Sequence, residues 1–239
     1  MTTVHFRQRR QAAGSPAIDE ISTRWSQIKD PAQFVLRYSP AIRAYLLALL
    51  QEPNDADDVS QDFLLHFLQR GLTAATPDRG RFRDYLKVSV RRAALAHLRK
   101  SAHRCQADGI SAEEAASDES AADDQWREQW RACLLERALR GIERHVREHP
   151  SCGYEVALEI ARELPEADSQ ERARVAGQRL GRCVSAAAFR QMLCRARSLF
   201  KAVLIQEVAK TLRDPTTDSI DEELADLELL ALVRDDPDR

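Results

Sequence analysis

Three basic side chains at four-residue spacing are the clearest candidates for binding chemistry in this sequence. Arg83, Lys87 and Arg91 lie within RFRDYLKVSVRRAALAHLRK, residues 81–100. Side chains four residues apart share one face of a helix, so a helix here presents a basic stripe. A basic stripe beside aromatic rings suits phosphate contacts and stacking on an unpaired base, although a merely solubilised helix face is the competing interpretation. Further candidate contacts in the same helix are Arg81, Phe82, Tyr85 and Arg92.

A second basic segment, residues 171–201, has the order of a helix, a tight turn and another helix. Gly181 stands in the predicted turn, and Ser185 is the predicted N-cap of the second helix. This order is typical of a helix-turn-helix, whose second helix enters the major groove of DNA. A plain pair of antiparallel helices with basic solubilising residues is the alternative. The side chains predicted to pack inward are Ala188, Phe189, Met192 and Ala196, and those predicted to approach DNA are Ser185, Arg190, Gln191, Cys194, Arg195 and Arg197.

The acidic stretch DADDVSQDF, residues 55–63, carries four carboxylates. It is either a solvated helix face or a docking surface for a basic partner. Val59 and Phe63 are spaced to face a core, which leaves Asp58, Gln61 and Asp62 on the surface.

Metal binding and catalysis are not favoured by the remaining motifs. His145 and His149 stand one helical turn apart with Cys152 beyond them, a spacing that can bind zinc. No fourth ligand is evident, so we interpret them as two surface histidines and a half-buried thiol. The sequence has no glycine-rich phosphate loop, GxSxG, HExxH or CxxC motif. We therefore predict no catalytic residues, metal or cofactor, and a protein that is not an enzyme.

Composition predicts a helical protein of the cytoplasm. The chain has 239 residues, of which 44% are hydrophobic and 6% aromatic, with eight glycines. Alanine, leucine, arginine and glutamate dominate, which favours an all-α fold. The five cysteines form no close pair and are interpreted as free thiols. No apolar run approaches the roughly 18 residues of a membrane span, and no signal peptide is recognisable at the start.

Helical periodicity and charge divide the chain into five parts. The first part, 1–21, is predicted to be a flexible N-terminal segment, and the second part, 22–104, a helical domain. In that domain Asp55 is the predicted N-cap of the second helix, and residues 81–103 form the predicted third helix. Residues 105–124 are acidic and poor in large apolar groups, which predicts a linker. The second domain, 125–213, opens on a helix, and the acidic tail, 214–239, contains a short predicted helix over 224–233. The apolar stripe of the opening helix is Trp126, Trp130, Cys133, Leu134, Ala138 and Ile142.

In this order the pieces resemble a bacterial RNA polymerase sigma factor of the sigma-70 family. The small two-domain extracytoplasmic-function (ECF) type is most similar. The residues that resemble the family's region 2 are Asp55, Ala56, Asp58, Gln61, Asp62, Phe63, Gly80, Phe82, Tyr85 and Leu86. Those that resemble the closing helix of region 4 are Arg195, Ala196 and Arg197. Four flanking stretches resemble a planctomycete-like subgroup: 23–26, 130–139, 207–211 and 221–224.

The resemblance implies a factor that binds core RNA polymerase and directs it to promoters. Residues 22–104 would be region 2 and 125–213 region 4, which implies contacts with the β′ clamp helices, the β flap and promoter DNA. The core-polymerase contacts implied are Asp55, Asp58, Gln61 and Asp62. The contacts implied with the melted −10 element are Arg81, Phe82, Arg83, Tyr85, Lys87, Arg91 and Arg92. The contacts implied with the −35 element are Ser185, Arg190, Gln191, Cys194, Arg195 and Arg197.

The sequence leaves three questions open. A helix-turn-helix DNA-binding regulator, or a helical interaction adaptor that does not act as a sigma factor, is the alternative function. An anti-sigma factor or other signalling partner is neither indicated nor excluded. The acidic tail also suggests, from its charge alone, an extension that occupies a basic DNA-binding face.

Overall fold

The fold is a set of helices built around one long antiparallel pair. The computed structural model describes residues 31–70, 81–104, 119–212 and 214–234. Within these ranges every regular element is a helix, which confirms the predicted all-α class. The helices are α1 (Pro31–Leu50), α2 (Pro53–Arg70), α3 (Phe82–Arg104), α4 (Glu119–Glu148), α5 (Tyr154–Glu163), α6 (Ser169–Leu180), α7 (Ala186–Ala209), α8 (Thr217–Asp226) and α9 (Leu230–Arg234).

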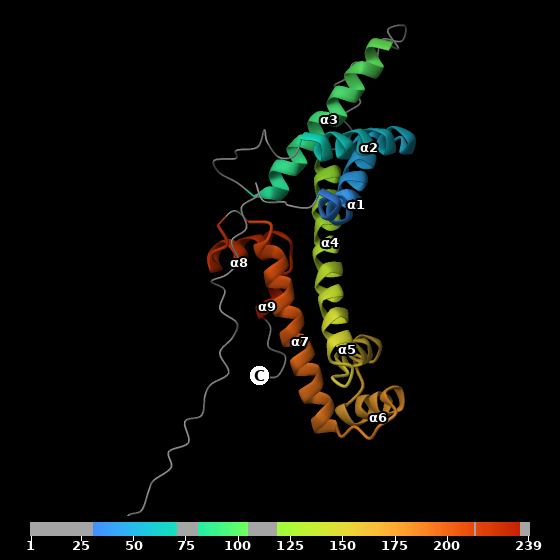
Figure 1. The fold of residues 1–239 in the computed structure, drawn as a ribbon, viewed down its shortest axis with the longest axis vertical. Helices are drawn as coiled ribbons and strands as arrows, with labels where there is room; N and C mark the ends of the chain where they lie inside the picture. The colour runs from blue at the N-terminus through green and yellow to red at the C-terminus, as the bar shows by residue number, and fades with distance from the viewer. Residues whose placement is uncertain (1–30, 71–80, 105–118, 213, 235–239) are drawn as a thin grey trace, which may run out of the picture.

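The long helices α4 and α7 pack against each other, with α1, α2 and α3 at one end and α5 and α6 at the other (Figure 1). Gly141 of α4 permits this approach. A Cβ atom at Gly141 would lie 2.6 Å from Cγ1 of Val203 in α7. Glycine in a helix interior costs about 1 kcal/mol relative to alanine. Here the absence of a side chain lets the two helices come close.

The larger core, which joins α1, α2, α3, α4, α7 and α8, is dominated by aromatic rings. Trp130 is fully buried and stacks on Tyr38, and Trp126 packs against Tyr45. Burying such rings makes the largest apolar contributions available to a core of this size. The predicted stripe of α4 is therefore confirmed as buried, and its first half packs on α1.

A smaller core lies at the opposite end, among α5, α6 and the beginning of α7. Its buried members are all apolar, and they sit at helical spacing on each of the three helices. They are Ala157, Ile160, Ala173, Ala176, Phe189, Met192 and Leu193.

Three local predictions differ from the structure. Asp55 lies in the first turn of α2 and is not its N-cap, because the helix begins at Pro53, whose fixed φ and missing N–H suit the first helical position. The helix α4 begins at Glu119, inside the range predicted as linker, and buries Ala122 in the larger core. The single helix predicted over 224–233 is two helices, because Glu228 has a φ of 56°.

Several sequence predictions lie outside the described residues. They are the N-terminal segment 1–21, the stretch 23–26, the loop at 71–80 with Gly80, the linker as far as 118, and the end of the tail from 235.

Candidate nucleic-acid and polymerase surfaces

The helix α2 presents the predicted acidic surface. Asp58, Gln61 and Asp62 are exposed, whereas Val59 is 6% exposed and Phe63 packs against the larger core. The predicted division of this helix into a core face and a polar face is thus confirmed. Asp55 is half-buried, and its Oδ2 lies 3.3 Å from Nε2 of His97 in α3. Of the four predicted contacts, Asp55 is therefore the one that lies beside a side chain of α3.

Two leucines extend the acidic surface of α2. Leu65 and Leu68 are 54% and 41% exposed. They follow Gln61 by four and seven residues, which places all three on one helix face. The surface therefore joins carboxylates to an apolar patch, a combination suited to another protein. Their spacing did not predict this exposure, because an amphipathic helix normally directs leucine to its own core.

The beginning of α3 contains two predicted DNA contacts that the structure places in the interior. Phe82 is 2% exposed and packs against Tyr38 and Trp130. Arg83 is 7% exposed. In this structure Phe82 cannot touch a base, because the larger core covers its ring. The centroid of its ring lies 6.5 Å from that of half-buried Tyr85, so Phe82 packs against Tyr85 from the side of the core.

Three of the predicted basic contacts are ion-paired to acids from elsewhere in the chain. Arg81 pairs with Glu222, Glu223 and Asp226 of α8. Arg83 also reaches Glu223 and Asp226, each at 3.5 Å. Lys87 Nζ lies 2.9 Å from an oxygen of Asp123 in α4. The basic stripe is therefore partly neutralised by carboxylates.

The second half of α3 extends beyond the rest of the fold (Figure 1). Arg91 is half-buried, and Arg92, Arg99 and Lys100 are exposed. Val88 is 45% exposed beside them. This part of the helix presents positive charge, which attracts the phosphate groups of a nucleic acid regardless of its sequence.

The helices α6 and α7 are joined as the sequence predicted. Asp168 caps α6, and Gly181 ends it with a φ of 63°, a conformation that glycine adopts without strain. Ser185 is confirmed as the N-cap of α7, because its Oγ accepts a hydrogen bond from the Ala188 N–H at 3.1 Å. This cap fixes where the second helix starts.

The face of α7 near this cap carries the predicted −35 contacts. Arg190, Gln191, Cys194 and Arg195 are exposed, and Arg197 is half-buried. Of the inward predictions, Phe189, Met192 and Ala196 are buried, but Ala188 is exposed. Leu193 is buried instead, because it lies four residues after Phe189 and so shares its face.

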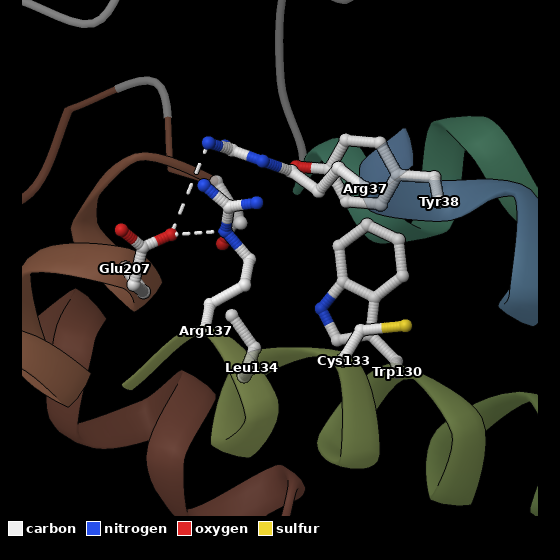
Figure 2. Close-up of a pocket in the computed structure, with 8 residues that line it drawn as sticks. Arg37, Tyr38, Trp130, Cys133, Leu134, Arg137 and Glu207 are labelled. Carbon is white, nitrogen blue, oxygen red and sulfur yellow. Dashed lines mark hydrogen bonds and ion pairs between the residues drawn. The ribbon is translucent and has the colours of Figure 1, made fainter. Parts of the chain in front are cut away.

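A buried charge cluster links α1, α4 and α7. Glu207 of α7 accepts hydrogen bonds from Arg137 and Lys210, each at 2.6 Å, and Arg37 lies 3.9 Å away. Figure 2 shows Arg37 and Arg137 both directed at Glu207. Burial alone raises the pKa of Glu207, but its bonds to Lys210 and Arg137 outweigh burial and hold the pKa below its usual range. The neighbouring cavity, of about 10 Å³, is too small for an organic ligand.

The described residues hold no group of three or more His, Cys, Asp or Glu side chains arranged to bind a metal ion. The rings of His145 and His149 stack on each other, and His145 also stacks on Tyr154. Cys133, Cys152, Cys183 and Cys194 are free thiols, and Cys105 lies outside the described residues. Among the helices described, none combines the length and the apolarity that crossing a membrane requires.

Comparison with known proteins gives one family. Residues 34–104 match the model of sigma-70 region 2. This span covers most of α1 and all of α2 and α3, including the acidic surface and the basic helix. No curated protein and no solved structure matches the chain. Residues 34–104 are therefore similar to sigma-70 region 2, which supports a sigma factor of the sigma-70 family.

Proposed function

We propose that this protein is a transcription initiation factor that binds core RNA polymerase and directs it to specific promoters. The observation that carries the proposal is the region 2 match over residues 34–104, because two surfaces of that region suit two different partners. The exposed carboxylates of α2 suit a basic protein surface, and the cations of α3 suit DNA.

Core polymerase would dock on α2. In this proposal Asp58, Gln61 and Asp62 make the polar contacts with the β′ clamp helices, and Leu65 and Leu68 add apolar area. Exposed charges at a protein interface contribute chiefly to specificity and association rate, while desolvated apolar anchors contribute most of the affinity. Asp55 would contribute through His97, by fixing α2 against α3.

The −10 element would lie along α3. In this proposal Arg91 and Arg92 would meet the phosphates of the melted strand, and Tyr85 would offer a ring for stacking. Arg81, Arg83 and Lys87 would join them once released from their carboxylate partners. The −35 element would meet α7 through Arg190, Gln191 and Arg195, with Ser185, Cys194 and Arg197 at the margin of the contact. This arrangement is of the ECF type, with a region 2, a region 4 and a linker between them.

Co-purification of the full chain with bacterial core RNA polymerase tests the proposal. We expect the wild type to associate, and the double variant Asp58→Lys/Asp62→Lys to lose association while keeping its helical circular dichroism spectrum. Glu128→Lys/Glu143→Lys is the matched control, since these exposed acids of α4 give the same charge change. A wild type that fails to associate at low salt contradicts the sigma-factor proposal, and would leave a DNA-binding regulator or an adaptor.

Run-off transcription separates the two surfaces. Arg91→Glu should retain association with polymerase but lose transcription, because a reversed charge repels the promoter strand. An Arg91→Glu protein as active as the wild type would remove α3 from the proposed mechanism.

A further inference from the structure

The acidic side of α8 lies against the beginning of α3. Three carboxylates of α8, on Glu222, Glu223 and Asp226, surround the guanidinium groups of Arg81 and Arg83. The closest contacts are those of Arg81 with Asp226 and, at 3.1 Å, of Arg81 Nη1 with Glu223 Oε2. Carboxylate and phosphate oxygens bind the arginine fork in the same geometry. The acids of α8 therefore occupy positions that suit phosphate oxygens.

The opposite side of α8 is held in the larger core. Ile220 and Leu224 are 5% and 0% exposed, and Leu227 and Leu229 just beyond the helix are equally buried. Thr216 and Ser219 form a capping box that fixes where α8 begins. The preceding segment is also attached, because the Thr211 carbonyl accepts a hydrogen bond from the Phe82 N–H at 3.4 Å. The acidic side of α8 is thus aimed at the two arginines by a defined apolar anchor.

A carboxylate of α4 contacts the same helix. Asp123, near the start of α4, pairs with Lys87, one turn beyond Arg83. Two segments outside residues 34–104 therefore place four carboxylates on three cations, which are Arg81 just before α3 and Arg83 and Lys87 within it. All three cations belong to the proposed −10 contacts.

We propose that α8 is an intramolecular competitor of nucleic acid, which occupies Arg81 and Arg83 and must leave them before α3 binds the phosphates of a single strand. This inference rests on the proposed function, because it assigns the regulation of the same surface. The occupant that displaces α8 is a single-stranded DNA backbone, which presents phosphates in series.

The polar part of this contact is suited to exchange. Glu222 and Asp226 have side chains that are 72% and 50% exposed. Ion pairs of such exposure contribute little each and are screened by salt. Glu223 is fully buried, yet neither of its carboxylate oxygens has an aligned hydrogen bond. A series of phosphates can therefore compete with α8, because it gains counterion release at each cation that it contacts.

Binding of a fluorescein-labelled single-stranded oligonucleotide, measured by anisotropy on the full chain, tests the inference. The double variant Glu222→Gln/Asp226→Asn removes the two exposed acids and leaves the apolar anchor intact. We expect it to bind about three- to tenfold more tightly than the wild type, the range that corresponds to two exposed ion pairs. The control Glu128→Gln/Glu143→Gln removes two exposed acids of α4 and should bind as the wild type does. Equal affinities for the α8 variant and the control overturn the inference.

Hydrogen exchange provides the second measurement. Amides of residues 217–226 should exchange faster when saturating oligonucleotide is added to the wild type, because displaced α8 loses its protection. Bound oligonucleotide with unchanged exchange in α8 overturns the inference. Both measurements omit polymerase, so their failure is distinct from a failure to co-purify with core polymerase, which bears on the proposed function alone.

Discussion

Tyr38 and Trp130 stack ring on ring, with centroids 4.7 Å apart and 13° between the ring planes. The contact joins the first helix of the matched region to α4, which follows it in the chain. Both side chains are almost completely buried. The matched residues 34–104 therefore complete their core with a helix that the family match does not include.

Removing one ring tests how firmly α4 belongs to this core. Trp130→Ala should lower the free energy of unfolding by about 3–5 kcal/mol, the range for a large aromatic side chain deleted from a core. Glu128→Ala, on the exposed face of the same helix, should change it by less than about 0.5 kcal/mol. Chemical denaturation followed by circular dichroism measures both. A loss below about 1 kcal/mol for Trp130→Ala would show that α4 is not firmly packed on α1.

Replacing Gly141 with alanine should lower the stability of the protein, even though alanine favours a helix more than glycine does. Gly141→Ala adds about 1 kcal/mol of helix propensity but places a methyl group against Val203, which costs about 1–3 kcal/mol. We expect a net loss of stability of about 1 kcal/mol on thermal or chemical unfolding. Adding Val203→Ala makes room for the methyl group, so the two changes should be coupled by about 1 kcal/mol. Additive effects would contradict the α4–α7 contact.

Glu207 should make the stability of the protein decrease as pH falls. Its pKa in the folded protein lies below the usual value of about 4.3, so the unfolded chain takes up the proton first as pH falls. The stabilisation by Glu207 is complete above about pH 5 and is lost as pH falls through the folded pKa. Glu207→Gln should therefore cost about 1–3 kcal/mol at neutral pH and progressively less in acid. A cost that stays constant from pH 7 to about pH 3 would contradict this electrostatic role.

The pKa of Glu223 is shifted in the opposite direction to that of Glu207, so its effect on stability should have the opposite dependence on pH. Burial raises its pKa above the usual range, although the charges of Arg83 and Arg81 oppose the rise; Asp84 adds to it. Its contribution to the docking of α8 is complete below about pH 4.3 and is lost as pH rises through the folded pKa. Hydrogen exchange of residues 217–226, corrected for intrinsic rates, should therefore show weaker protection at neutral pH than at about pH 5. Glu223→Gln should reduce this pH dependence, and an undiminished dependence in that variant would exclude Glu223 as its source.

The faces of the helices could be predicted from the sequence, and their partners could not. Periodicity correctly placed Trp126 and Trp130 on a buried stripe and Asp58 and Asp62 on an exposed face. A stripe shows which side of a helix is covered, but not which helix covers it. The spacing of the residues therefore could not predict that Trp130 packs on Tyr38.

The engaged state of the basic helix was also only partly predictable. Its four-residue spacing indicated a charged stripe, yet Arg81 and Asp226 are 145 residues apart and become partners only in the folded chain. The charge of the tail suggested such an occupant, but buried Ile220 and Leu224 of α8 are what direct its acids to Arg81 and Arg83. The prediction that Phe82 contacts DNA was wrong, because an aromatic residue beside basic residues can pack into the core as readily as it can stack on a base.

The two tryptophans of α4 have an optical consequence. Both indole rings are shielded by side chains of α1, so any movement that separates α1, α2 and α3 from α4 transfers them from an apolar surrounding to water. Indole emission shifts to longer wavelength on such a transfer. The protein thus contains its own fluorescent reporter of whether α4 has left the first three helices, and the reporter can be read without a label while DNA is added.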